Sequence, residues 1–155
     1  MREVWPENLP LTARFGVIEF DGRDEKTLAE AIGLVKTFKN EGLDFLSVSM
    51  GFSTIEANVP WAPAFMAPIA KRVRDETGLA VGTAWGMDIP QDAERAIDEQ
   101  QMDVVFAARA HLANPHYPFR VARELGLPAA GSVLPDQYAY WLRRYPGPQN
   151  GPVID

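Results

Sequence analysis

The chain has 155 residues, about the size of one domain, and a formal net charge of −6. The acidic balance and the lack of a basic stripe argue against nucleic acid as a partner. There is no cysteine, which excludes disulfides and thiol chemistry. The longest apolar run is far shorter than the ~20 residues that span a bilayer. These features predict a soluble, cytoplasmic protein.

The first part of the chain predicts a strand, a helix and a second strand. Residues 13–20 are the first predicted strand, and Arg14 within it is unusual, because a charged residue inside a strand is normally paired, exposed or functional. Asp24 is expected to cap the following helix, and Gly42 to end it in the left-handed conformation. Residues 44–50 are the second predicted strand. The inner face of the helix is expected to carry Leu28, Ala31, Ile32, Val35 and Phe38.

The middle of the chain repeats this pattern. Residues 51–60 form a polar loop that is long enough to cover a site, and the helix after it is expected to end at Gly78. Residues 79–85 are the third predicted strand. The next helix starts near Pro90, and residues 103–108 are the fourth predicted strand. The helix between these two strands is expected to bury Ala93, Ala96 and Ile97.

The last part of the chain is predicted to be helical. A helix is expected from about His116 to Leu125, then a loop over residues 131–135 and a short aromatic helix over residues 137–145. The remaining residues, 146–155, contain three prolines and two glycines and are expected to form a flexible tail.

The fourth predicted strand, residues 103–108, has a short apolar run of the kind seen in parallel strands that are covered on both faces. Small residues at its end allow another group to approach the backbone. Arg109 then offers a permanent charge and a planar fork of donors, which suits a phosphate. The third strand likewise ends in a glycine, Gly86. Two adjacent strand–helix units with these features predict a phosphate-binding site.

Four alternating strand–helix units predict a parallel sheet. The sheet can belong to a doubly wound open fold or to an eight-stranded barrel. The dinucleotide fingerprint G-x-G-x-x-G is missing, and in barrels a phosphate site typically follows strands seven and eight. If the third and fourth predicted strands are strands seven and eight of a barrel, residues 1–145 form the carboxyl-terminal half, strands 5–8, of a TIM (β/α)8 barrel.

Six segments carry a resemblance to a known family, namely residues 5–16 (WPENLPLTARFG), 46–49 (LSVS), 60–66 (PWAPAFM), 84–86 (AWG), 108–116 (ARAHLANPH) and 138–142 (YAYWL). With these segments, the chain resembles the second half of an Old Yellow Enzyme, a flavin-dependent ene-reductase, in the xenobiotic-reductase-like bacterial branch. The resemblance runs from about residue 3 to residue 145. It implies a TIM barrel that binds FMN noncovalently at the carboxyl ends of its strands.

The resemblance also implies roles for individual residues. Arg14 matches an arginine beside the flavin N1 and O2 edge, where a cation stabilises negative charge on the reduced flavin. Gly86 matches a position whose backbone N–H contacts the FMN phosphate, and Arg109 matches the phosphate-binding arginine. Trp85 and Trp141 match tryptophans that shape the active-site mouth, the second of which can reach a neighbouring subunit in relatives.

Ala108 departs from the family, which usually has glycine just before the phosphate-binding arginine. Alanine can still donate its N–H there if its φ is negative, so we expect a contact that is kept but tighter. The resemblance thus implies Arg14, Trp85, Gly86, Ala108 and Arg109 as FMN-binding residues, and Trp85 and Trp141 as substrate-pocket residues.

Catalytic residues are not expected in this chain. The family's proton-donating tyrosine, its flavin- and substrate-binding pair (His/His or His/Asn) and its tuning thiol all belong to the first four strands. His111 and His116 follow the fourth strand and are expected to face solvent or bond locally. No spacing of His, Asp and Glu suits a metal. Asp44 and Asp103 are expected to be structural caps at the bottom of the barrel.

The leading interpretation is one half of an FMN ene-reductase that reduces activated C=C bonds of α,β-unsaturated carbonyl compounds, with NADPH or NADH as hydride donor. A half-barrel has two unpaired strand edges and an uncovered inner face, so we expect a partner chain that carries strands 1–4. The start at a methionine just before a mid-protein motif suggests a split or engineered enzyme. Association of the completed barrel into a further oligomer is also possible from the sequence.

Two other functions remain open from the sequence. The first is a self-associating half-barrel that binds FMN or phosphate without turnover. The second is a phosphate-binding barrel enzyme of another chemistry, such as an isomerase.

Overall fold

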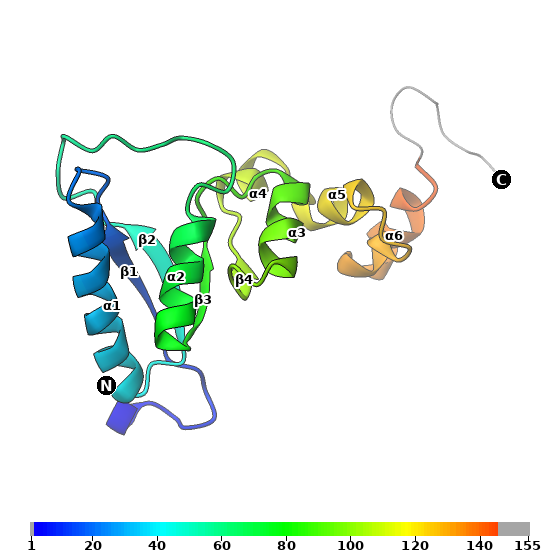
Figure 1. Ribbon diagram of the computed structural model, residues 1–155. Helices are drawn as coiled ribbons and strands as arrows, with labels where there is room; N and C mark the ends of the chain where they lie inside the picture. Colours follow the sequence, from blue (N-terminus) through cyan, green and yellow to red (C-terminus); the bar gives the residue numbers. More distant parts are fainter. Residues whose placement is uncertain (1, 146–155) are drawn as a thin grey trace. The chain divides into compact units, whose positions relative to one another are not determined.

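The computed structural model describes residues 2–145 and contains two compact units, residues 2–107 and residues 108–145 (Figure 1). The first unit holds the β-sheet and the helices between its strands, and the second unit is helical. The prediction that residues 1–145 form one half-barrel domain stays a prediction, and the predicted flexible tail, residues 146–155, lies outside the described residues.

The first unit alternates strands and helices in the predicted order. It opens with a short 3-10 helix, η1 (Arg2–Val4). The strands are β1 (Thr12–Ile18), β2 (Phe45–Met50), β3 (Ala80–Thr83) and β4 (Val104–Val105). The helices that follow the first three strands are α1 (Asp24–Asn40), α2 (Ala67–Thr77) and α3 (Pro90–Asp98).

The strands form one parallel sheet with the neighbour order β1-β2-β3-β4. Each strand therefore pairs with the strand before it in the chain, as in a barrel wall, whereas the strand order of a doubly wound sheet reverses at a switch point. The predicted parallel sheet of four strand–helix units is confirmed. The sequential order is consistent with a partial TIM barrel, and the assignment to strands 5–8 stays a prediction.

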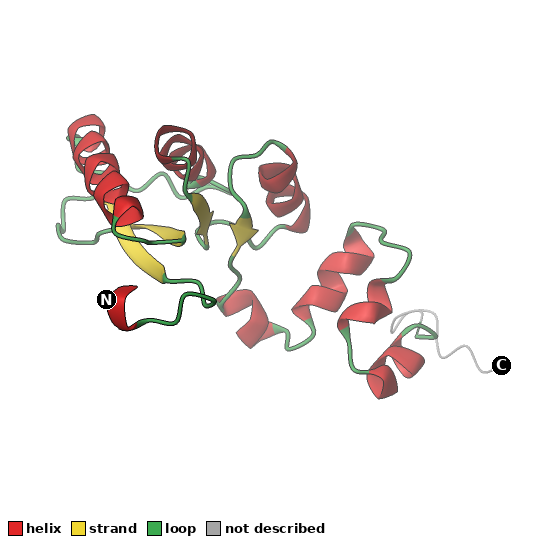
Figure 2. Ribbon diagram, turned by 90° about the horizontal axis from the view of Figure 1, so that it is seen from below, coloured by secondary structure: helices red, strands yellow, loops and turns green. Residues whose placement is uncertain are grey.

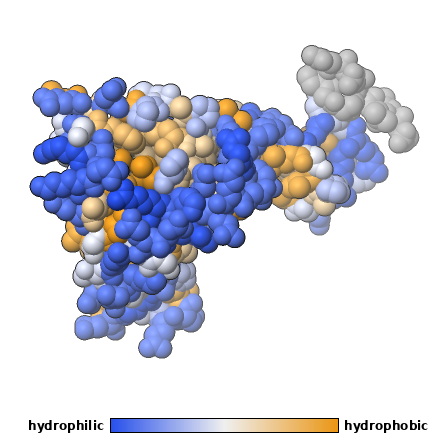
Figure 3. Space-filling view, viewed as in Figure 1, coloured by the Kyte–Doolittle hydropathy of each residue, from blue (hydrophilic) through white to orange (hydrophobic). Residues whose placement is uncertain are grey.

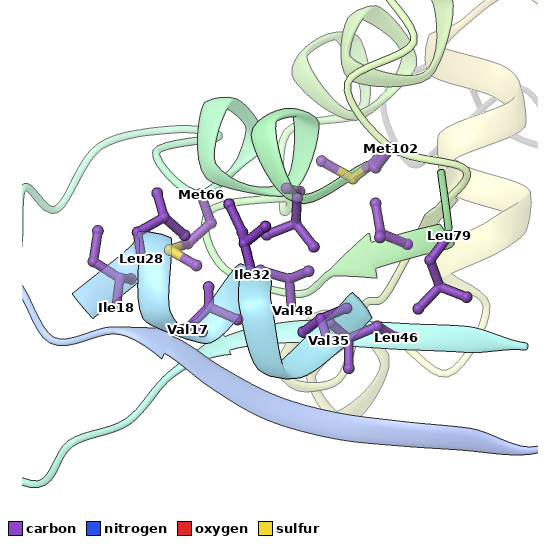
Figure 4. Close-up of a cluster of buried hydrophobic side chains, with 14 of the residues drawn as sticks. Val17, Ile18, Leu28, Ile32, Val35, Leu46, Val48, Met66, Leu79 and Met102 are labelled. Carbon is purple, nitrogen blue, oxygen red and sulfur yellow. The ribbon is translucent and has the colours of Figure 1, made fainter. Parts of the chain in front are cut away.

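The helices α1, α2 and α3 lie on the same side of the sheet (Figure 2), and the hydrophobic core lies between them and the strands (Figure 4). Strand residues Leu46, Val48 and Val81 and helix residues Ile32 and Val35 have almost no exposed surface. The outward surface of the helices is mostly hydrophilic, with apolar patches between (Figure 3). The predicted inner face of α1 is confirmed, because Leu28, Ala31, Ile32 and Val35 are buried and Phe38 is half-buried.

The opposite side of the sheet, called the open face here, carries Thr12, Arg14, Phe45, Val104 and Phe106. The strand register places these side chains in neighbouring rows. A hollow of about 380 Å³ lies among them. Within the described chain this face is largely uncovered, since Thr12, Arg14 and Val104 are exposed.

The prediction for the fourth strand is wrong in length and in burial. Instead of residues 103–108 covered on both faces, β4 has two residues, and Val104 is 41% exposed. Within residues 2–145, β4 pairs with β3 alone, and its open-face side chain, Val104, is only partly covered. The apolar run therefore located the strand but did not reveal which of its faces this chain covers. The third strand is also shorter than predicted, because β3 ends at Thr83.

Two details of the predicted helices are wrong and three are confirmed. Asp24 is the first residue of α1 and Arg23 is the N-cap; the Asp24 carboxylate accepts a hydrogen bond from the Phe20 N–H at 2.7 Å instead. Ile97 is 38% exposed because Ala96 takes the inward position on α3. As predicted, Gly42 and Gly78 follow helices with φ of +91° and +60°, and Pro90 begins α3.

The second unit contains the helices α4 (Arg109–Ala113), α5 (Tyr117–Glu124) and α6 (Asp136–Leu142), with a 3-10 turn, η2 (Ala130–Val133), between the last two. The elements α5 and α6 correspond to the two predicted C-terminal helices. Helix α4 was not predicted, because its five residues are too few to show a helical period. In the part of the chain that the structure describes, no helix is both long enough and apolar enough to span a membrane.

Candidate functional site

Three side chains meet near the carboxyl end of β2, namely Arg14 from β1, Ser49 from β2 itself and Trp85 from the segment that follows β3. The Arg14 Nη2 donates a hydrogen bond to the Ser49 Oγ at 3.0 Å, and the Trp85 Nε1 lies 3.5 Å from the same oxygen. Arg14 pairs with Ser47 in the register, and Ser49 lies two residues further on, so Arg14 and Ser49 are diagonal neighbours on one side of the sheet. The structure thus joins two predicted FMN-site residues, Arg14 and Trp85, through a serine.

Three aromatic rings pack against Trp85. The rings of Phe52, Trp61 and Phe65 have their centroids 5.4, 5.8 and 6.5 Å from that of Trp85. Phe52 and Trp61 are themselves more than half exposed. Trp85 therefore packs against an aromatic cluster in which Phe52 and Trp61 face solvent, and its role at a pocket mouth stays a prediction.

Gly86 is held against the segment before α2. Its φ is +71°, and an added Cβ would lie 2.7 Å from both the Ala62 carbonyl oxygen and the Ala64 nitrogen. The Ala64 N–H donates a hydrogen bond to the Gly86 carbonyl at 2.8 Å. Only glycine fits this position without strain. The contact uses the carbonyl of Gly86 and not its N–H, which is the group predicted to bind phosphate.

The loop after β2 is anchored by Glu19, a residue that the sequence did not identify. The Glu19 carboxylate accepts hydrogen bonds from the Ser53 N–H at 3.0 Å and the Ser53 hydroxyl at 2.8 Å. The Asn58 N–H also donates to the Phe20 carbonyl at 2.7 Å. These contacts tie the loop that carries Phe52 to the end of β1.

The other predicted site residues, Ala108, Arg109 and Trp141, lie in the second unit. The φ of Ala108 is −100°, which meets the condition stated for its N–H to donate. Arg109 is exposed and begins α4. Trp141 is 70% exposed and stacks edge-on against Tyr140 at 5.1 Å. Whether these residues form one site with Arg14 and Gly86 stays a prediction.

The histidines of the second unit are exposed and make local ring contacts. His111 lies 5.3 Å from Tyr117, and His116 lies 5.8 Å from Tyr138, between ring centroids. Both histidines face solvent, as predicted. No group of three or more His, Cys, Asp or Glu side chains within residues 2–145 is arranged to hold a metal ion.

Asp44 and Asp103 act as structural caps at the amino ends of the strands, as predicted. Asp44 accepts a hydrogen bond from the Leu11 N–H at 2.7 Å and pairs with Arg2. The Leu11 bond, followed by the one from Arg2, lowers the pKa of Asp44 below its ordinary value. Asp103 accepts from the Val81 N–H at 2.9 Å and pairs with Arg74 at 3.1 Å. The pairing of Arg2 with Asp44 was not foreseen.

The residues of the first unit fit one edge of a flavin. Arg14 presents a cation on the open face and is held by a neutral hydroxyl, so its charge is not neutralised there. Gly86 is required by the backbone of Ala62 and Ala64, which a Cβ would clash with. An electron-rich edge, such as the N1 and O2 edge of a flavin, would fit beside the Arg14 cation.

The chain is similar in sequence to curated NADPH dehydrogenases. It is 32% identical over 144 residues to the NADPH dehydrogenase of Halalkalibacterium halodurans, covering 92% of this chain and 40% of that protein. For the NADPH dehydrogenase of Geobacillus thermodenitrificans the identity is 31% over 127 residues, covering 82% and 36%.

A third NADPH dehydrogenase, from Geobacillus sp. strain WCH70, is 30% identical over 133 residues, covering 86% of this chain and 38% of the relative. No family model matches the chain. The chain is therefore distantly homologous to NADPH dehydrogenases and spans 36 to 40% of the length of these relatives.

Proposed function

We propose that this chain is the FMN-binding part of an NADPH dehydrogenase of the Old Yellow Enzyme family, in its xenobiotic-reductase-like branch. The complete enzyme reduces activated C=C bonds of α,β-unsaturated carbonyl compounds. On this proposal the chain supplies strands 5–8 of a TIM barrel, and a second polypeptide supplies strands 1–4.

The observation that carries this proposal is the position of Arg14. It lies on the uncovered side of a parallel sheet whose strands are neighbours in chain order. In a closed barrel, that side is the interior, and the active site lies at the carboxyl ends of the strands. The Arg14 guanidinium reaches toward that end, because it bonds to Ser49, the residue before the last of β2. The homology to NADPH dehydrogenases over most of this chain supports the same placement.

Each residue has a defined task on this proposal. Arg14 holds a permanent positive charge beside the N1 and O2 edge of the flavin. The Gly86 and Ala108 N–H groups and the Arg109 guanidinium bind the phosphate. Trp85 and Trp141 border the substrate pocket and exclude water from it. In such an enzyme, FMN that NADPH or NADH has reduced supplies the hydride for the C=C bond.

The proton donor and the residues that bind the substrate carbonyl belong to the second polypeptide on this proposal. A chain without strands 1–4 then binds FMN weakly and has no turnover. This expectation separates the proposal from an independent enzyme of another chemistry.

The test combines the purified chain with a polypeptide covering strands 1–4 of the Halalkalibacterium halodurans relative, in the presence of FMN. We expect retained flavin absorbance near ~450 nm, a property of the cofactor, and NADPH oxidation that depends on 2-cyclohexenone. The chain alone and the second polypeptide alone are the controls.

The other outcomes of this test contradict the proposal. Flavin bound by the chain alone, without turnover in the mixture, favours a self-associating half-barrel that binds FMN. No flavin in any sample favours a phosphate-binding barrel enzyme of another chemistry.

A further inference from the structure

The hydroxyl of Ser49 connects two residues of the candidate site, Arg14 on β1 and Trp85 in the segment after β3. We infer that Ser49 is a positioning residue, which fixes the guanidinium of Arg14 and the indole of Trp85 in the orientation that the flavin site needs. This inference rests on the proposed function and adds to it a residue that is expected to touch neither substrate nor flavin.

The hydrogen-bonding capacity of Ser49 is fully used. A serine hydroxyl has one proton to donate and two lone pairs. The Ser49 Oγ accepts from Arg14 at 3.0 Å and lies 3.5 Å from the Trp85 Nε1, and it donates to the Met50 carbonyl at 3.3 Å. The residue is only 4% exposed, so water does not replace these partners easily. A buried and saturated hydroxyl has a single preferred orientation.

Arg14 depends on this contact for its orientation. Within residues 2–145, the hydrogen bond to Ser49 is the one that the Arg14 side chain makes, and the side chain forms no salt bridge there. An arginine on a flexible stem loses considerable rotamer freedom when it is fixed. A preformed hydrogen bond reduces the further loss when a ligand binds. Because the partner is neutral, the guanidinium charge stays available.

Trp85 is fixed at both ends. The rings of Phe52, Trp61 and Phe65 pack against the indole, and the Ser49 hydroxyl lies at its Nε1. The 3.5 Å separation is at the long end of the hydrogen-bond range, so this bond is weaker than the one to Arg14. Loss of the hydroxyl is therefore expected to affect Arg14 more than Trp85.

The first test needs no flavin. In the 15N-labelled chain, the indole N–H resonance of Trp85 is assigned with Trp85→Phe and then compared in Ser49→Ala and Ser47→Ala. Ser47 is the matched control, because it lies on the same strand and the same side of the sheet and pairs with Arg14 in the register. We expect Ser49→Ala to move the Trp85 resonance and Ser47→Ala to leave it in place. A resonance that Ser49→Ala does not move would overturn the inference.

The second test uses the complemented protein with FMN. We expect Ser49→Ala to raise the FMN dissociation constant about tenfold, as the loss of one charge-assisted hydrogen bond would. The flavin reduction potential should shift to a more negative value, as in Arg14→Ala, and Ser49→Thr should restore both quantities. In an Arg14→Ala background, Ser49→Ala should change the potential no further.

The results separate this inference from the proposed function. If the wild-type complex binds no FMN, the proposed function fails, and the indole resonance still decides whether Ser49 holds Trp85. If the wild-type complex binds FMN and Ser49→Ala has the same affinity and potential, the inference is wrong, whatever the resonance shows. Circular dichroism of each variant establishes that the sheet is intact.

Discussion

Two arginines of this chain supply the positive charge that the proposed flavin site needs. Arg14 is held by a neutral serine, and Arg109 is exposed at the start of α4. An arginine without a carboxylate neighbour offers its whole charge to a ligand. The two arginines lie in different units, and each can be replaced without the other.

Replacement of Arg109 by alanine should weaken FMN binding by the complemented protein by about 1.5–3 kcal/mol, the usual contribution of a hydrogen bond to a charged group. Fluorescence titration with FMN measures the change. Arg120→Ala is the control, since Arg120 is also exposed in the second unit but pairs with Glu124 at 3.0 Å. An FMN affinity unchanged by Arg109→Ala would place the phosphate elsewhere.

Gly86→Ala should destabilise the chain more than an ordinary glycine substitution in the left-handed region. The φ of +71° alone costs about 1–2 kcal/mol for alanine. The clash of the new Cβ with backbone atoms at 2.7 Å adds about 1–3 kcal/mol. Urea unfolding followed by circular dichroism measures the sum.

Gly22→Ala is the matched control for Gly86→Ala. Gly22 has a φ of +86°, but a Cβ there would meet nothing within 4 Å. We expect this variant to show the conformational cost only. Equal losses of stability in the two variants would mean that the segment around Ala62 moves aside and leaves room for the methyl group.

At the scale of the elements, one carboxylate fastens the beginnings of two strands. Asp44 precedes β2, accepts a hydrogen bond from Leu11 just before β1, and pairs with Arg2 of η1. Its pKa is lowered in the folded chain. The stability that it contributes is therefore present above the unfolded pKa of about 3.9 and is lost as the pH falls through the folded value.

Asp44→Asn should lower stability at pH 7 and flatten the pH dependence of unfolding below about pH 4. The two unfolding curves should converge in acid, where Asp44 is protonated in the wild type. Thermal unfolding between pH 7 and pH 2 measures this. Asp75→Asn is the control. It removes an exposed ion pair with Lys71 on α2 and should leave the pH dependence of unfolding unchanged. If Asp44→Asn unfolded with the same pH profile as the wild type, the contacts of Asp44 with Leu11 and Arg2 would not have the stabilising role assigned to them.

Sequence patterns predicted the elements with a clear period and missed contacts that join distant residues. The helical spacing from Leu28 to Val35 identified the buried face of α1 correctly. The charge of Arg14 inside a strand marked an unusual position. Ser49 had no such signal, because its partners lie 35 and 36 residues away in the chain, and a serine in a strand has no distinctive pattern.

Burial was the property that the sequence predicted least well. The apolar run at Val104 suggested cover on both faces, yet one side of the sheet is open. An apolar strand is buried by other parts of the complete fold. The pattern of its side chains does not show whether those parts belong to the same stretch of chain. Glu19 was missed for a related reason, since its partner Ser53 lies in a loop without periodic structure.

At the scale of the whole molecule, the open face is the surface on which the proposed partner would pack. Phe45 and Phe106 lie there with ring centroids 5.9 Å apart. Gly82 lies between them on β3, where a Cβ would be 3.1 and 3.0 Å from these rings. Aromatic rings over a glycine form an apolar surface that a closed barrel would bury. The proposed partner with strands 1–4 is expected to cover it.

Phe106→Asp should weaken association with the strand 1–4 polypeptide by about 2 kcal/mol or more, because a charge would enter a buried apolar contact. Titration calorimetry of the two polypeptides measures the affinity. Leu34→Asp is the control, since Leu34 is 50% exposed on α1, on the helical side of the sheet. An association unaffected by Phe106→Asp would show that the partner binds another surface.

The neighbour order of the strands bears on how the chain is made. Each strand pairs with the one that leaves the ribosome just before it, 22 to 35 residues earlier in the chain, so no pairing within the sheet has to wait for a strand that is made much later. Once α1 and β2 have emerged, they can already bury apolar side chains together with β1. The sheet can therefore be assembled during translation, one strand at a time, from β1 toward β4.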